Sequence, residues 1–343
     1  MLKKILLVYP GCGGGALAIT KHCEDALERL NIPFESFDFN EERDFFFDIF
    51  SLARNNRPDF YKELDPGYHS AQLANQKLIV TVLALKPEIV FVNYGLLLFT
   101  QTLKLLHELK IKTCCWFGDD PAALEQSKKI SPHFDLFFTH EPATMAVHQR
   151  LGAKVKYLPY ACNERVHRLV ELRAEERKNL SSEVSFVGNH TTHREHLLSS
   201  LTDFDLKVWG DGWDRSSLGD FVKGGGVSQE EMVRIFNASK ISINIHRENM
   251  AGGGGLNCRT YEICACGALQ IADERSDLPA LFKVGEELLT FKEREDLKEK
   301  VRYYLKNPGQ RERIARAGHR RVADYTYLKR ARQILREVEN EDC

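Results

Sequence analysis

The sequence lacks a long apolar run, which disfavours a membrane-spanning protein. No segment approaches the roughly 18 consecutive apolar residues of a transmembrane helix. The opening stretch MLKKILLVYPGCGGG is apolar only over 5–9 before a glycine turn. It therefore predicts a first β-strand and not a signal peptide. We expect no membrane span, while peripheral association with a membrane stays open.

An excess of charge of one sign is also missing. Lys and Arg number 48 against 49 Asp and Glu, so the chain has no overall positive field to hold a nucleic-acid backbone. The cysteines do not form a small loop-rich disulfide framework, because their count of nine is odd and they lie beside predicted strands and helices. We expect reduced thiols, a cytoplasmic protein and no nucleic-acid partner.

The length of 343 residues indicates about two domains. In the first half, short apolar runs alternate with longer amphipathic segments, a pattern typical of βαβ units and a parallel sheet. Four phenylalanines between 45 and 50 are predicted to pack in the core. The predicted strands of this half are 3–9, 34–39, 87–93, 112–117, 135–139 and 155–158, and the helices are 17–30, 41–52, 70–85, 100–109 and 143–151.

The charged run 163–183 contains no strand pattern and is the best candidate for a domain boundary. The alternation then restarts, and the chain becomes almost wholly helical from 294 onward. We therefore predict an α/β protein with two Rossmann-like βαβ domains facing a central cleft. The predicted strands of the second half are 184–187, 207–209, 241–245 and 269–272, and the helices are 192–201, 228–238 and 258–266.

Ligands of open parallel sheets bind beyond the carboxyl ends of the strands, so the loops that follow strands are the candidate sites. Glycines in the first such loop let backbone N–H groups approach a ligand. The spacing is not a clean GxGxxG, but Asp38 ends the second strand, as in NAD-binding proteins. An oxidoreductase is therefore a rival reading. The candidate inter-domain or acceptor-binding residues are Gly11, Gly13, Gly14 and Asn93.

Two further loops of the first half hold groups that could exchange protons. Asp119 and Asp120 follow the strand 112–117, and either could serve as a general base. Asp120 precedes Pro121, so it could instead cap a helix, which would leave Asp119 for chemistry. His140 follows the next strand and could be a base near neutral pH.

The second half opens with a strand, then Gly188, and then a helix whose first turn contains Arg194. A guanidinium forms charge-assisted, often bidentate bonds with phosphate, so Arg194 is a candidate for holding a diphosphate. The nearby His190, His193 and His196 lack a Cys or carboxylate that would complete a ligand set. We expect no metal.

The strongest candidate loop follows the strand 241–245. Its bare backbone amides could cradle a sugar or phosphate, and the short helix after it begins near Asn257 and Arg259. Glu262 lies one turn further, where a carboxylate could accept two hydrogen bonds from ribose hydroxyls. The glycines of this loop are Gly252, Gly253, Gly254 and Gly255.

These residues give the chain a family resemblance. The stretch 184–335 resembles the glycosyl-transferase-family-1-like domain of CgeB-type, spore-maturation-like proteins. The resemblance lies in the ordered runs VSFVGN, WGDGW, SKISINIH, NCRTYEICACGALQIAD and KVRYYLKNPGQRERIARAGHRRVADYTY. The first half is similar to the partner domain of the same group through WFGDDP, FDLFFTHE and RLGAKVKYLPYACN.

The resemblance implies a GT-B fold without a bound metal. It divides the chain into an acceptor domain over 1–165, a nucleotide-sugar donor domain over 166–325 and a final helix over 326–343 that crosses back to the first domain. In similar enzymes a glutamate at the place of Glu262 holds the donor ribose. Related retaining enzymes carry a second glutamate eight residues earlier, where this chain has Gly254.

The resemblance therefore implies a metal-independent glycosyltransferase that uses a nucleoside-diphosphate sugar and an unknown acceptor, such as a glycan, a protein or a small molecule. Arg194 and Arg259 would hold the diphosphate, and Asp119 would be the base if transfer inverts the anomeric centre. The alternatives are a nucleotide-sugar epimerase of the same fold, an NAD-dependent oxidoreductase and a non-catalytic nucleotide-sugar-binding protein.

Overall fold

The computed structural model describes residues 4–10, 14–247 and 254–340. The chain divides into two compact units. Unit 1 comprises Met1–Leu158 together with Ala331–Cys343, and unit 2 comprises Pro159–Arg330. None of the helices in the described part of the chain is both long and apolar enough to cross a membrane.

Unit 1 contains a six-stranded parallel sheet in the order β2-β1-β3-β4-β5-β6. The central strands β1 and β3 are buried over their whole length, which explains their continuous apolar sequences ILLVY and IVFVN. The strands are β1 (Ile5–Tyr9), β2 (Phe34–Asp38), β3 (Ile89–Asn93), β4 (Lys112–Phe117), β5 (Leu136–Thr139) and β6 (Val155–Tyr157).

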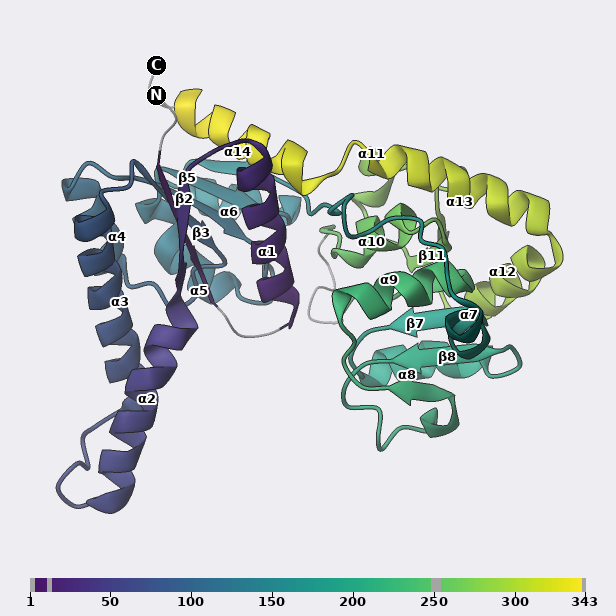
Figure 1. Cartoon of the computed structure of the whole chain (residues 1–343), viewed down its shortest axis with the longest axis horizontal. Helices are drawn as coiled ribbons and strands as arrows, with labels where there is room; N and C mark the ends of the chain where they lie inside the picture. The colour runs from purple at the N-terminus through teal and green to yellow at the C-terminus, as the bar shows by residue number, and fades with distance from the viewer. Residues whose placement is uncertain (1–3, 11–13, 248–253, 341–343) are drawn as a thin grey trace. The chain divides into compact units, whose positions relative to one another are not determined.

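The helices of unit 1 connect these strands (Figure 1). In the core, Leu78 and Leu103 of two helices pack against Val90 and Phe137 of the sheet. The helices are α1 (Gly14–Arg29), α2 (Phe39–Asn56), α3 (Pro66–Leu85), α4 (Thr100–Glu108), α5 (Leu124–Ile130), the 3₁₀ helix η1 (Ser131–His133) and α6 (Pro142–Arg150).

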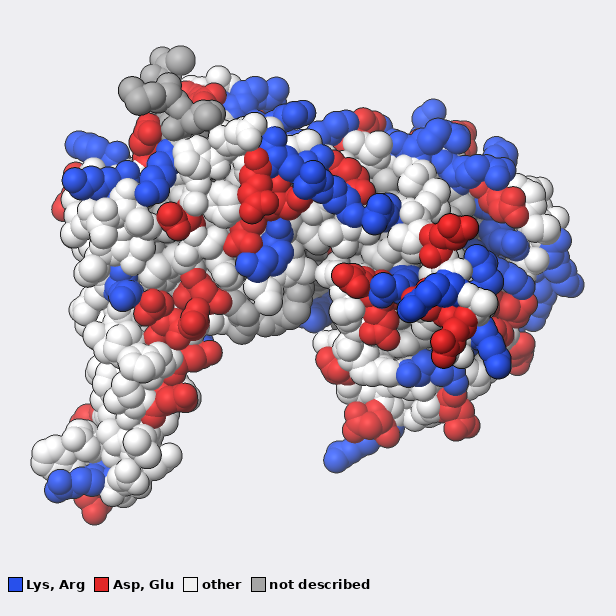
Figure 2. All heavy atoms as spheres, viewed as in Figure 1, with Lys and Arg blue, Asp and Glu red and all other residues white. Residues whose placement is uncertain are grey.

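The helices α2 and α3 form a hairpin that extends from the sheet (Figure 1). The phenylalanines of α2 do not pack as the sequence predicted. Phe45 and Phe47 are 64% and 41% exposed, so their assignment to the core was wrong. In Figure 2 the hairpin shows a mostly uncharged surface with acidic side chains along one edge. The pattern misled because an apolar run in a helix does not distinguish a buried face from an exposed one.

Unit 2 contains a second six-stranded parallel sheet, in the order β12-β11-β10-β7-β8-β9. Successive residues of its strands point to opposite faces and enter different cores. Phe186 belongs to one buried cluster and the adjacent Val187 to another. The strands are β7 (Ser182–Val187), β8 (Leu206–Trp209), β9 (Val222–Gly224), β10 (Ser239–Asn244), β11 (Leu269–Asp273) and β12 (Leu289–Phe291).

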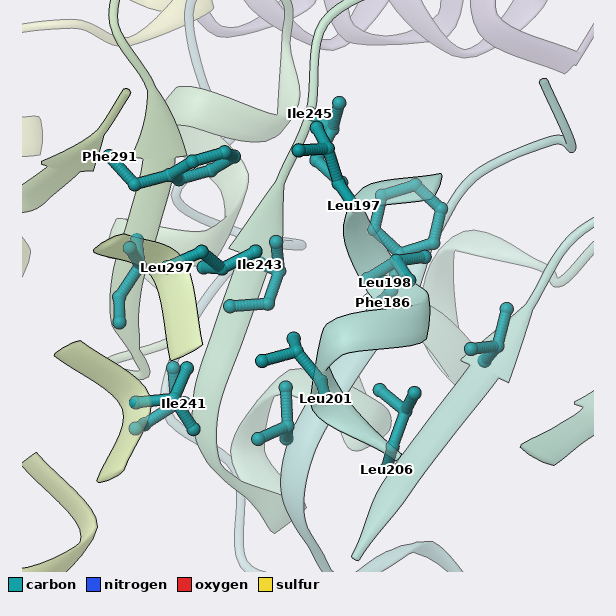
Figure 3. Packing of buried hydrophobic residues seen from close by; sticks show 14 of the residues in the cluster. Phe186, Leu197, Leu198, Leu201, Leu206, Ile241, Ile243, Ile245, Phe291 and Leu297 are labelled. Carbon is teal, nitrogen blue, oxygen red and sulfur yellow. The ribbon is translucent and has the colours of Figure 1, made fainter. Parts of the chain in front are cut away.

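Helices cover this second sheet. Figure 3 shows Ile241 and Ile243 of β10 packed among leucines of the neighbouring helices, including Leu201 and Leu297. The helices are α7 (Ala174–Leu180), α8 (Thr192–Leu198), η2 (Ser199–Leu201), η3 (Gly219–Phe221), α9 (Gln229–Ala238), α10 (Arg259–Ala265), α11 (Leu278–Leu281), α12 (Arg294–Lys306) and α13 (Pro308–Val322). The predicted α/β class with two Rossmann-like sheets is confirmed.

The last helix, α14 (Tyr327–Asn340), begins in unit 2 and from Ala331 onward is part of unit 1. Where the chain enters and leaves unit 2, the two segments pair with each other. The N–H of Cys162 donates to Tyr325 O at 2.9 Å, and the N–H of Tyr327 donates to Cys162 O at 3.0 Å. Further along α14, Lys156 of β6 pairs with Glu337 at 2.5 Å.

Candidate functional site

The carboxyl ends of β7, β10 and β11 lie side by side in unit 2, because these strands are parallel neighbours in the sheet. The loops that follow them contain most of the residues that the sequence assigned to a donor site. In an open parallel sheet this edge is where ligands bind. The site is therefore built from three adjacent loops and the first turns of two helices.

Arg194 lies in the first turn of α8, where the hydroxyl of Thr191 accepts a hydrogen bond from its backbone N–H. Its guanidinium donates from Nε and Nη2 to Ile245 O, at 3.1 and 2.7 Å, and from Nη1 to Asn189 O at 2.8 Å. It also lies over the ring of Phe186, 5.4 Å from the centroid. Arg194 thus joins the loop after β7 to the loop after β10.

The charge of Arg194 is poorly compensated. The side chain is 7% exposed, and no carboxylate of the described residues lies within ion-pair distance of its guanidinium. Burial, together with the neighbouring charges of Arg247 and Arg259 and against the opposing charge of Asp273, lowers its pKa to about 10. Three guanidinium groups therefore share this edge of unit 2, which favours an anionic ligand.

Arg259 and Glu262 face each other across the first turn of α10, where Arg259 Nη1 pairs with Glu262 Oε2. Arg259 also donates from Nε to Val187 O at 3.3 Å. Glu262 is 3% exposed. Its second oxygen lies 3.8 Å from Nε2 of His167, a residue that the sequence did not single out.

His167 is held in one tautomer. Its Nδ1 accepts the backbone N–H of Asn163 at 3.0 Å, so Nε2 carries the proton, 2.8 Å from the Gln229 side-chain oxygen. Because this N–H also faces Glu262, His167 helps to fix the orientation of that carboxylate. No sequence signal could have found this contact, since His167 lies in the charged run assigned to the domain boundary.

A second histidine couples the ends of β10 and β11. The Nδ1 and backbone N–H of His246 both donate to Asp273 Oδ1, at 2.7 and 2.9 Å. The Nε2 of His246 accepts the backbone N–H of Asn257 at 3.1 Å. Burial alone would raise the pKa of Asp273, but the electrostatic attraction of the His246 ring N–H and the two hydrogen bonds from His246 outweigh it and hold that pKa below its usual value.

The start of α10 is fixed by an amide network. Asn257 Oδ1 accepts the backbone N–H of Thr260 at 3.2 Å, although the N-cap position of α10 is Cys258, one residue further along the chain. Asn257 Nδ2 donates to Asn244 Oδ1 at 2.9 Å, and Asn244 Nδ2 donates to Gln270 Oε1 at 3.1 Å. These bonds connect the site loop to the interior of the sheet, so the backbone before Arg259 has a defined position.

The predicted glycines fall into two groups. Gly252 and Gly253 lie outside the described residues, whereas Gly254 and Gly255 are buried. Gly188 lies where chain segments approach closely. Its carbonyl accepts the Trp213 indole N–H at 2.9 Å, and a Cβ on it would lie 3.0 Å from the Phe186 ring.

Asp120 of unit 1 is held in a buried hydrogen-bond network, and the predicted capping role for it was wrong. It does not cap a helix, because α5 begins only at Leu124. Its carboxylate has no exposed surface and accepts hydrogen bonds from Ser127 at 2.7 Å and Thr144 at 3.3 Å, with His148 Nε2 at 2.8 Å. These hydrogen bonds connect α5 and α6 to the end of β4.

The other predicted residues of unit 1 lie at the carboxyl ends of its strands. Asp119 is half-buried, and its carbonyl accepts the N–H of Ala123 at 2.9 Å. His140 is completely buried after β5. Asn93 ends β3 and donates to the Thr20 hydroxyl at 2.8 Å.

The glycine loop after β1 is described only in part. Gly14 is the first residue of α1, whereas Gly11 and Gly13 lie outside the described residues. The acidic residue at the end of β2 has a local role. The Asp38 carboxylate caps α2 by accepting the N–H groups of Asn40 and Glu41 at 3.0 and 3.1 Å. The Asp38 carboxylate therefore helps to fix the start of α2.

Each of the two units holds a parallel six-stranded sheet, and unit 2 has a cationic edge beyond its strands. This architecture is that of the GT-B fold. Residues 192–336 match the family described as glycosyl transferase-like. Over 291 residues the chain is 24% identical to the spore protein CgeB of Bacillus subtilis (strain 168), covering 79% of this chain and 89% of that protein. The predicted resemblance to CgeB-type proteins is confirmed.

Solved structures show the same fold. Sucrose-phosphate synthase from Thermosynechococcus elongatus superposes with a TM-score of 0.69 at 14% identity, covering 98% of this chain and 99% of that chain. Anabaena HepE in complex with UDP-glucose gives a TM-score of 0.65 at 12% identity, with the same coverage of both chains. The chain is thus similar to CgeB over most of its length and has the GT-B fold, and the family match and the fold together support an enzyme of glycosyl transfer.

Proposed function

We propose that the protein transfers a sugar from a nucleoside-diphosphate sugar to an acceptor without a bound metal ion. The main support for this proposal is the cationic edge of unit 2, where the buried Arg194 lies near Arg247 and Arg259. Among the described residues, no carboxylate forms an ion pair with Arg194. The Anabaena protein of the same fold was solved with UDP-glucose, which supports a nucleotide sugar as the anionic ligand.

In this proposal the diphosphate binds at the three guanidinium groups. Arg194 is fixed by carbonyl oxygens and contributes positive charge from its buried position. Arg259 and Arg247 are more exposed and contact the phosphates. Charge that develops on the leaving diphosphate is stabilised by groups already in place, so little reorganisation is needed during transfer. This positive edge supplies the stabilisation that a metal ion gives in other transferases.

Glu262 is the proposed ribose contact. Its carboxylate is a charged acceptor oriented by Arg259 and His167, and in this proposal the ribose hydroxyls donate to it. The acceptor is proposed to bind at the carboxyl ends of the unit 1 strands, near Asn93. Asp119 at the end of β4 is the candidate base if the anomeric centre is inverted.

Calorimetry with UDP and with UDP-glucose tests the donor assignment. Wild-type protein should bind both in the presence of EDTA, and Glu262→Gln should lower both affinities about tenfold or more, because a charged acceptor of hydrogen bonds is lost. Glu286→Gln, an exposed carboxylate of unit 2, is the matched control. Wild-type protein that binds neither nucleotide, or a Glu262→Gln variant with unchanged affinity, would contradict the assignment.

A further inference from the structure

Gly254 lies against two polar side chains of the loop that follows β11. A Cβ on this glycine would lie 2.4 Å from both Asp277 Oδ1 and Ser276 Oγ, and 3.0 Å from Asp277 Cγ. Real Cβ atoms essentially never approach other atoms so closely, so any other residue at 254 would displace these groups. Glycine at this position lets a carboxylate and a hydroxyl reach the backbone of the neighbouring loop.

The direction of the Asp277 side chain is not explained by its own helix. Asp277 precedes α11 in the N-cap position, yet its carboxylate makes no capping hydrogen bond. Asp38 and Asp65, by contrast, cap α2 and α3 with their carboxylates. The Asp277 carboxylate is instead directed toward Gly254, while the buried Leu278 anchors the backbone beside it.

The two carboxylates at the end of β11 have different surroundings. Asp273 accepts both N–H groups of His246 and so joins β11 to β10. Asp277 is half-buried and lies at the loop that leads from β10 to Arg259 and Glu262. This places a negative group and a hydroxyl at the same strand ends as the three guanidinium groups.

A carboxylate would repel a diphosphate, so Asp277 is unsuited to the phosphate part of an anionic ligand. A carboxylate beside a hydroxyl is suited to a neutral ligand with several hydroxyl groups, because both accept hydrogen bonds from them. We propose that Asp277, with Ser276, determines the sugar specificity of the site by binding hydroxyls of the transferred sugar. This inference rests on the proposed function of unit 2.

The test compares UDP with UDP-glucose on single variants. Asp277→Asn should leave the UDP affinity within about twofold of wild type and lower the UDP-glucose affinity about 10- to 100-fold, the usual effect of losing hydrogen bonds to a charged group. Gly254→Ala should give the same pattern, because its Cβ displaces the carboxylate. Glu274→Gln, an exposed carboxylate of the same loop, should change neither affinity.

The outcomes separate the two proposals. If wild-type protein binds UDP but Asp277→Asn leaves UDP-glucose binding unchanged, the specificity role of Asp277 is overturned and the proposed function stands. An equal loss of UDP and UDP-glucose binding also overturns it, since Asp277 would then support the nucleotide site as a whole. Wild-type protein that binds neither ligand overturns the proposed function.

Discussion

Replacement of Arg194 by methionine separates the effect of the buried charge on folding stability from its effect on the binding of an anionic ligand. In the folded protein the guanidinium is held by the carbonyls of Ile245 and Asn189 and lies over Phe186. Methionine removes the charge and the donors but retains a long flexible side chain that can fill the space. The variant therefore tests whether this arginine is kept for stability or for an anion.

Two opposing free energies decide the expected stability. A pKa that falls from 12.5 to about 10 corresponds to a cost of roughly 3 kcal/mol for holding the charge in the folded state. Loss of the donors leaves the buried Ile245 carbonyl unsatisfied, which costs about 1–3 kcal/mol, whereas Asn189 is exposed and its carbonyl can bind water. The two effects nearly cancel, so the free energy of unfolding should change by less than about 2 kcal/mol.

The assay combines urea denaturation with calorimetric titration of UDP. Arg194→Met should unfold close to wild type yet bind UDP about tenfold more weakly or worse, because a charge that stabilises the diphosphate is absent. Arg313→Met, which removes an exposed arginine of α13, should change neither quantity. If Arg194→Met loses more than about 4 kcal/mol of stability and keeps its UDP affinity, the residue is structural and the reasoning fails.

Two further predictions concern buried carboxylates. Asp120→Asn should lower the free energy of unfolding by about 2–4 kcal/mol, because it removes the charge that Ser127 and His148 satisfy; an unchanged urea midpoint would contradict the structural role. Asp273→Asn should destabilise the protein at neutral pH. Because the folded pKa of Asp273 lies below the ordinary value of 3.8, its stabilisation is present above about pH 4 and is lost as pH falls through the folded pKa. The difference between wild type and this variant should therefore shrink in acid denaturation series, and a constant difference would exclude the His246 pairing as its cause.

The strands that the sequence predicted with the clearest signal are those whose residues are apolar by themselves. β1, β3 and β4 are buried runs that any parallel sheet would require. The three-residue strands β9 and β12 were missed because they are too short for a periodic signal and form only by pairing with β8 and β11. Local patterns therefore gave all six strands of the first sheet, but only the four central strands of the second.

The candidate site divides in the same way. Glycines, arginines and a carboxylate in loops after strands could be found from the sequence, because their positions follow from the strand order. The partners of those residues could not, since His246 and Asp273 are 27 positions apart. Asp120 is a second example. Its hydrogen-bond partner His148 lies in α6, 28 positions further along the chain, so the sequence around Asp120 did not reveal the contact.

The order of charges along the strand ends of unit 2 is consistent with the polarity of a nucleotide sugar. Arg194 after β7 and Arg259 at the start of α10 are positive and suit phosphates, whereas Glu262 of α10 and Asp277 after β11 offer acceptors for hydroxyls. A free phosphate has no hydroxyl-bearing ring for either carboxylate and would be repelled by both of them. A diphosphate with a hydroxyl-bearing ring at each end satisfies all four groups together, and this agreement of separate loops favours the proposed donor over a simple anion.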